Sequence, residues 1–132
     1  VAKKKYFEKL PSIVFDIVDA FEEFKCNFKR IGYIMNIFLP PASVERSKKR
    51  FLQIENVEGL EDYNLNWYKK IETKLGNINV WERIITDKDH FSELLCQYDF
   101  NSLFEEEISL DMKYIKEFIH VADEYANERT NF

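Results

Sequence analysis

The stretch from Ser102 to Asn127 constrains the fold of this chain more than any other. Its apolar residues recur every three or four positions, a spacing that predicts one long amphipathic helix. Ser102 followed three residues later by Glu105 has the form of a capping box, so we expect the helix to begin there. The apolar positions form two adjacent stripes, whereas an ordinary surface helix has one. The second stripe consists of Leu110, Tyr114, Phe118, Val121 and Tyr125. It is predicted to pack against a neighbour within the fold or against a second copy of the chain.

Helical spacing also runs through most of the remaining sequence. It predicts further helices over about 11–30, 43–54, 60–75, 79–85 and 86–97. Residues 31–39 form the most apolar run, which fits an extension of the first helix or a short buried helix of its own. A strand is also possible there, but no neighbouring segment offers it a clear partner. Gly76 stands where a glycine ends a helix. The 132 residues include only 3 Gly and 3 Pro, so the chain has few of the turn-forming residues that hairpin-rich β folds use. The predicted fold class is therefore all-α, with residues 1–132 as a single compact bundle of five to seven helices around the long C-terminal helix.

Charge is distributed unevenly along the chain. Residues 1–50 carry 11 Lys and Arg against 6 Asp and Glu, whereas residues 51–132 carry 8 against 18. An acidic half of this size repels nucleic acid and attracts a basic protein. No stretch approaches the length of a membrane-spanning helix, and no export signal follows the N-terminal lysines. We therefore expect a cytoplasmic protein without a membrane partner, in which Cys26 and Cys96 are reduced thiols, although their pairing stays open.

Few residues have the spacing of a catalytic or metal-binding motif. Glu117 and His120 have the Glu-x-x-His spacing of di-iron helical bundles, but both fall on the polar face of the predicted helix, which argues against an internal metal site. The sequence contains no phosphate-binding glycine loop, no Gly-x-Ser-x-Gly, no Cys-x-x-Cys and no His-Glu-x-x-His. These observations predict a protein without metal or cofactor that is not an enzyme.

Arg83 and His90 suggest an alternative. With six residues between them, they resemble the Arg-x4–6-His motif of the HEPN ribonucleases, which are small helical proteins and often dimeric. The resemblance covers these two positions and the expected helical fold, and Ile84 stands where that family commonly has a polar residue. It implies an RNA-cleaving groove lined by Arg83 and His90.

The profile of the whole chain resembles bacterial immunity proteins and antitoxins. It combines a small predicted helical bundle, an acidic C-terminal part, 16% aromatic residues and no catalytic motif. The resemblance implies an inhibitor that covers the active site of a cognate nuclease-type toxin, itself basic, through an acidic surface with aromatic anchors. The expected contact residues are Glu58, Glu61, Asp62, Tyr63, Glu105, Glu106 and Asp111. A dimerising structural helical domain is a third interpretation.

Overall fold

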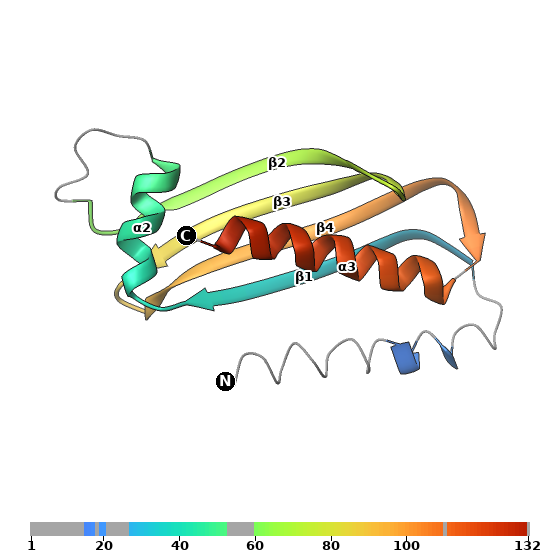
Figure 1. The fold of residues 1–132 in the computed structure, drawn as a ribbon, viewed down its shortest axis with the longest axis horizontal. Coiled ribbons are helices and arrows are strands. Elements are labelled where there is room, and N and C mark those ends of the chain that lie inside the picture. Colours follow the sequence, from blue (N-terminus) through green and yellow to red (C-terminus); the bar gives the residue numbers. More distant parts are fainter. Residues whose placement is uncertain (1–14, 18, 21–26, 53–59, 110, 132) are drawn as a thin grey trace.

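Four β-strands contain about half of the residues that the structure describes. The computed structural model describes residues 15–17, 19–20, 27–52, 60–109 and 111–131. In chain order the elements are β1 (Asn27–Leu39), α2 (Ala42–Phe51), β2 (Asn64–Thr73), β3 (Gly76–Asp87), β4 (Phe91–Ser109) and α3 (Met112–Thr130). The strands form one antiparallel sheet in the order β1-β4-β3-β2. Helix α3 lies along one face of this sheet, and α2 lies at one end of it (Figure 1).

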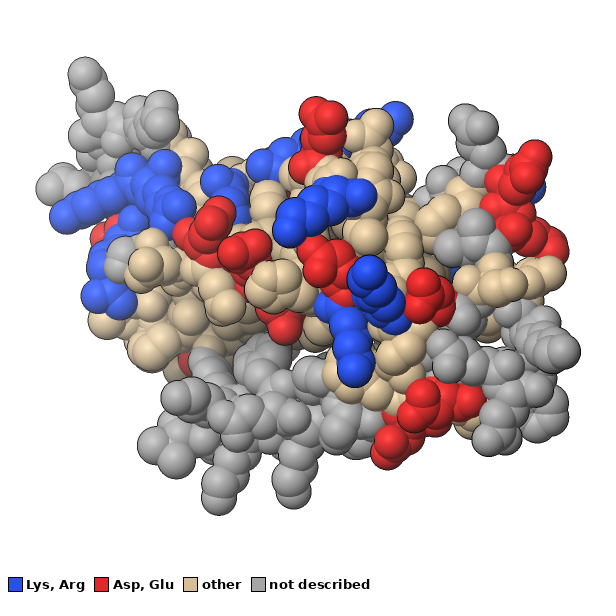
Figure 2. Space-filling model, turned by 45° about the vertical axis from the view of Figure 1, so that its right-hand side comes forward, with Lys and Arg blue, Asp and Glu red and all other residues tan. Residues whose placement is uncertain are grey.

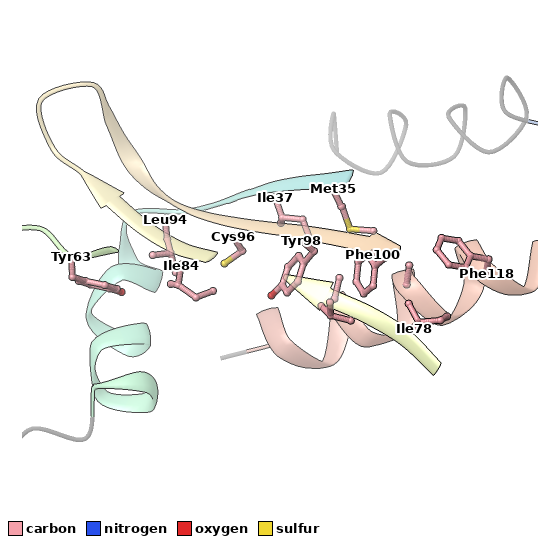
Figure 3. Packing of buried hydrophobic residues seen from close by; sticks show 13 residues of the cluster. Met35, Ile37, Tyr63, Ile78, Ile84, Leu94, Cys96, Tyr98, Phe100 and Phe118 are labelled. Atoms are coloured by element: carbon pink, nitrogen blue, oxygen red, sulfur yellow. The ribbon is translucent and has the colours of Figure 1, made fainter. Parts of the chain in front are cut away.

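The core lies between the sheet and α3. Alternate residues of the two central strands are buried, as expected where a sheet has one covered face. They include Ile78, Val80, Ile84, Leu94, Cys96, Tyr98 and Phe100. Figure 3 shows several of these side chains in one layer, with Phe118 of α3 at its end. Tyr125 of α3 packs edge-on against Tyr98 and Phe100, with ring centroids 6.1 Å and 5.7 Å away. The second apolar stripe of the C-terminal helix therefore packs against the sheet within the fold from Tyr114 onward, and Leu110 lies outside the described residues.

The prediction of an all-α bundle is wrong. The strands occupy most of the predicted helices 60–75, 79–85 and 86–97, together with the end of 11–30. Two positions four residues apart share one face of a helix, which turns by about 100° per residue, and also one face of a strand, in which side chains alternate. Trp67 and Ile71 therefore fit both periods, and the spacing that predicted helices is equally that of strands.

The C-terminal helix is shorter than predicted. Strand β4 continues through Ser102 as far as Ser109, and α3 begins only at Met112. Asp111 caps the helix in place of Ser102, because its carboxylate accepts a hydrogen bond from the backbone N–H of Lys113 at 2.9 Å. Ser102, Leu103, Ile108 and Ser109 pair with β1 on either side of an irregularity in the register. This pairing satisfies backbone groups at both ends of the segment and outweighs its helical spacing.

One local prediction is confirmed, because helix α2 overlaps the predicted helix 43–54. Residues 31–39 belong to strand β1, although the lack of an evident partner strand in the sequence had favoured a helix there. Gly76 has a positive φ of 92°, but it lies in the hairpin between β2 and β3 and not at the end of a helix. Such hairpins need only short turns, so a chain poor in Gly and Pro can still form this sheet.

Candidate functional site

The face of the sheet that points away from α3 carries the candidate site. Strand pairing places its outward side chains in rows that cross all four strands. Four large apolar side chains on this open face are 40–62% exposed, namely Ile34, Phe38, Tyr68 and Trp81. Single exposed apolar residues are common, but a group of them on one face of a small protein is typical of a binding surface.

One row of the open face is polar. It crosses the strands at Asn36, Gln97, Arg83 and Asn66. The Gln97 amide donates to Asn36 Oδ1 at 2.8 Å. Arg83 donates through Nη1 to Gln97 Oε1 at 3.3 Å and through Nε to Asn66 Oδ1 at 2.9 Å. These hydrogen bonds hold the guanidinium in one position, so Arg83 would lose little conformational entropy on binding a partner.

The neighbouring row is aromatic and contains the only exposed Trp among the described residues. Trp81 and Tyr68 are paired edge to face, with ring centroids 6.3 Å apart, and Asp99 lies opposite Trp81 on β4. A hollow of about 250 Å³ opens between Trp81 and Arg83, and another of about 330 Å³ opens between Trp81 and Tyr68. Trp81 and Asp99 line both hollows, and Arg30 lines the larger one. The site thus combines an aromatic anchor with charges of both signs.

A buried ion pair lies beneath the open face. Glu82 on β3 has no solvent exposure, and Arg129 of α3 binds its carboxylate through Nε and Nη2 at 2.8–3.1 Å. The guanidinium lies 5.4 Å from the ring centroid of Phe51 and 5.7 Å from that of Trp67. Because no ligand can reach Glu82, we interpret this network as structural. It joins α3, β3 and α2 into the support of the candidate site.

The predicted contact residues near the start of β2 take part in internal contacts. Glu61 forms an ion pair with Lys88, and the Asp62 carboxylate accepts a hydrogen bond from the Lys88 backbone N–H at 3.1 Å. Tyr63 is only 9% exposed, and its hydroxyl is hydrogen-bonded to Ser47. Glu58 lies outside the described residues. The exposed carboxylate of Glu61 is thus the part of this group most accessible to a partner.

The second predicted group lies at the other end of the sheet. Glu105 and Glu106 belong to the last part of β4, and Asp111 precedes α3 (Figure 1). Phe91, at the opposite end of β4, is next to the turn that contacts Glu61 and Asp62. Fifteen residues of strand span up to about 50 Å, whereas one side of a standard interface is roughly 30 Å across. The structure therefore does not bring the two groups together, and contact by either group alone stays a prediction.

Arg83 and His90 lie on one β-hairpin. Arg83 is in the polar row, and His90 is in the turn between β3 and β4 with 77% of its side chain exposed. Its Nδ1 lies 2.8 Å from Asp87 Oδ2, and this hydrogen bond lowers the pKa of Asp87. The resemblance to the HEPN ribonucleases included an expected helical fold. The structure contradicts that part, because Arg83 and His90 lie on a hairpin of a β-sheet. No cluster of three or more His, Cys, Asp or Glu side chains within the described ranges is arranged to hold a metal ion.

The sequence analysis did not identify the residues of the open face. The helices predicted over 60–75 and 79–85 did not single out Tyr68 or Trp81, whereas alternation would have placed Trp81 with Asn79 and Arg83 on a polar face. Comparison with protein-family models, curated protein sequences and solved structures finds no significant match to this chain. In the described part of the chain, no helix has the length and hydrophobicity to cross a membrane.

Proposed function

We propose that this chain is a protein-recognition domain that binds its partner on the open face of its sheet. The observation that carries the proposal is the exposed apolar group around Trp81, next to an Arg83 held in place by the polar row. Trp, Tyr and Arg are the residue types most enriched among interface hot spots. Trp81, Tyr68 and Arg83 bring all three together on one rigid sheet.

The specific form that we propose is an inhibitor of the immunity or antitoxin type, whose partner is a basic toxin. The formal net charge of −5 supports this choice of partner, because opposite charge speeds the approach of two proteins. In this scheme long-range attraction guides the encounter, and Trp81 anchors the complex. A cytoplasmic location belongs to the same proposal.

Pull-down from the native host with three baits tests the proposal. The baits are the wild-type chain, Trp81→Ala and Lys113→Ala, the last being an exposed residue of α3 on the other side of the sheet. The recovered protein is then purified and titrated against each bait. We expect Trp81→Ala to weaken its affinity by roughly thirtyfold or more, as for a hot spot of about 2 kcal/mol, and Lys113→Ala to leave it unchanged.

Two results would contradict the proposal at different levels. A partner that binds Trp81→Ala as tightly as the wild-type chain would exclude the open face as its docking surface. A partner that depends on Trp81 but keeps its own activity in the complex would support recognition and exclude the inhibitory role.

A further inference from the structure

A groove runs between the free edge of β2 and helix α3, on the side of the sheet opposite the open face. Its volume is about 600 Å³. β2 is the terminal strand of the sheet, and no other strand in the ranges that the structure covers pairs with its outer edge. A terminal strand directs backbone N–H and C=O groups outward, where an added strand can pair with them. One side of the groove therefore offers backbone N–H and C=O groups of β2 with which an added strand can form hydrogen bonds.

The groove has an apolar floor and an acidic rim. Ile71, Val121 and Tyr125 form the floor. The rim carries Glu117, Glu124 and Glu128, all on α3. None of these three carboxylates forms an ion pair with another described residue. We call this feature the acidic groove.

The neighbouring lysines leave the acidic groove negative. Lys74 is the one Lys or Arg that lines it, against the three glutamates of α3. Lys70 and Glu72 alternate onto the opposite face of the sheet. The ammonium of Lys69 lies over the Tyr125 ring at the floor of the groove, 4.9 Å from its centroid. Figure 2 shows basic side chains gathered at the left end of this view and others in its middle, among the red carboxylates. Three glutamates against Lys69 and Lys74 still leave the groove with an excess of negative charge among the described residues.

We infer that the acidic groove binds a basic, extended segment of a protein partner as an additional strand on β2. Strand addition supplies affinity through backbone hydrogen bonds, and side-chain contacts on alternate residues supply specificity. Here the carboxylates select Lys or Arg, and the apolar floor accommodates the aliphatic stems of those side chains. A second copy of this chain is a poor occupant, because it would bring the same carboxylates to the groove.

The spacing of the glutamates fits an extended segment. Glu124 and Glu128 are separated by about 6 Å along the helix axis, at roughly 1.5 Å per residue. Alternate side chains of a strand lie about 6.8 Å apart on one face. Because α3 runs along the strands (Figure 1), basic residues at every second position of the added segment would meet successive carboxylates. The inferred recognition element is thus a strand with alternating basic residues.

A synthetic peptide of alternating Lys and Val is the probe for this inference. Its binding to the full chain is measured by calorimetry, beside a peptide of alternating Glu and Val and a Lys–Val peptide whose alternate backbone amides are N-methylated. We expect binding of the first peptide alone, with at least about tenfold weaker affinity for the N-methylated form. Equal binding of the methylated peptide would overturn strand addition, and equal binding of the acidic peptide would overturn the charge selection. No detectable binding of the basic peptide would overturn the inference as a whole.

Charge-reversal variants locate the site. Glu124→Lys combined with Glu128→Lys should weaken binding of the basic peptide at least about tenfold, whereas Asp89→Lys combined with Glu107→Lys, an equal change of charge at exposed positions outside the groove, should not. Equal loss in both variants would show attraction by net charge alone and overturn the assignment to the groove. Trp81→Ala should leave peptide binding unchanged, so this inference and the proposed function on the open face can fail separately.

Discussion

Arg129 in the last turn of α3 and Glu82 in the middle of β3 form an ion pair across 47 positions of sequence. Glu82 is fully buried, whereas the Arg129 side chain is 26% exposed. Removing one partner of such a pair leaves a buried charge without compensation. The packing of α3 against the sheet therefore depends on the ion pair that Arg129 forms with Glu82.

Arg129→Met should lower the free energy of unfolding by about 3 kcal/mol, because it strips the Glu82 carboxylate of its cation while keeping most of the aliphatic volume. The measurement is urea unfolding followed by circular dichroism. Lys113→Met on the exposed side of α3 is the matched control, for which we expect a change within about 0.5 kcal/mol. Equal effects of the two substitutions would mean that the pair contributes nothing specific.

Two tyrosines that pack against each other should respond in opposite ways to loss of the hydroxyl. Tyr125 donates to Glu82 Oε2 at 3.0 Å, so Tyr125→Phe should cost about 1.5–3 kcal/mol. The Tyr98 hydroxyl is buried without a hydrogen-bond partner among the described residues, and burial raises its pKa. Tyr98→Phe should therefore be neutral or stabilising. Thermal unfolding of both variants checks this, and a large loss in Tyr98→Phe would show that the hydroxyl has a partner.

The two described glycines in strands should tolerate alanine differently. Gly76 has a φ of 92°, which L-residues rarely adopt, so Gly76→Ala should destabilise the protein by about 1–2 kcal/mol although nothing lies within 4 Å of the new Cβ. A Cβ at Gly32 would meet the Phe100 carbonyl oxygen at 3.7 Å, an ordinary contact, so Gly32→Ala should be neutral. Unfolding by denaturant measures both, and a costly Gly32→Ala would contradict the assigned register of β1.

Asp123 should make stability depend on pH. Burial raises its pKa, outweighing attraction to His120 and the hydrogen bond from Tyr33, and its Oδ1 has no described hydrogen-bond partner. A carboxyl whose pKa is raised by folding favours the native state at low pH, and this contribution is lost as the pH rises through the raised pKa. Asp123→Asn, which cannot ionise, should therefore be more stable than the wild-type chain at pH 7.

The stability advantage of Asp123→Asn should shrink as the pH falls and vanish below about 3.9, the ordinary pKa of Asp. Unfolding free energies at a series of pH values test this, with the exposed Glu124→Gln as the control on the same helix. An advantage of Asp123→Asn that is constant with pH would exclude ionisation as its cause.

Short-range signals in the sequence were sufficient for part of the fold. The apolar spacing after Met112 and the polar residues between its stripes predicted the helical part of the C-terminus correctly, because a helix satisfies its backbone locally. Helix α2 was also predicted from neighbouring residues. Gly76, which was expected to end a helix, lies in a hairpin, and residues 31–39 form a strand where a helix had been favoured. The uneven distribution of charge along the chain was likewise determined from the sequence without any structure.

Tertiary structure decided the rest, for a physical reason. Strands satisfy their backbone groups with partners far away in sequence, so residues 60–109 could be assigned as strands only once β1, β3 and β4 lay side by side. The same holds for Glu82, whose burial depends on Arg129, and for Trp81, which is exposed because α3 covers the other face of the sheet. Apolar residues four positions apart suit a helix and a strand equally, and only the surrounding sheet determines which of the two forms.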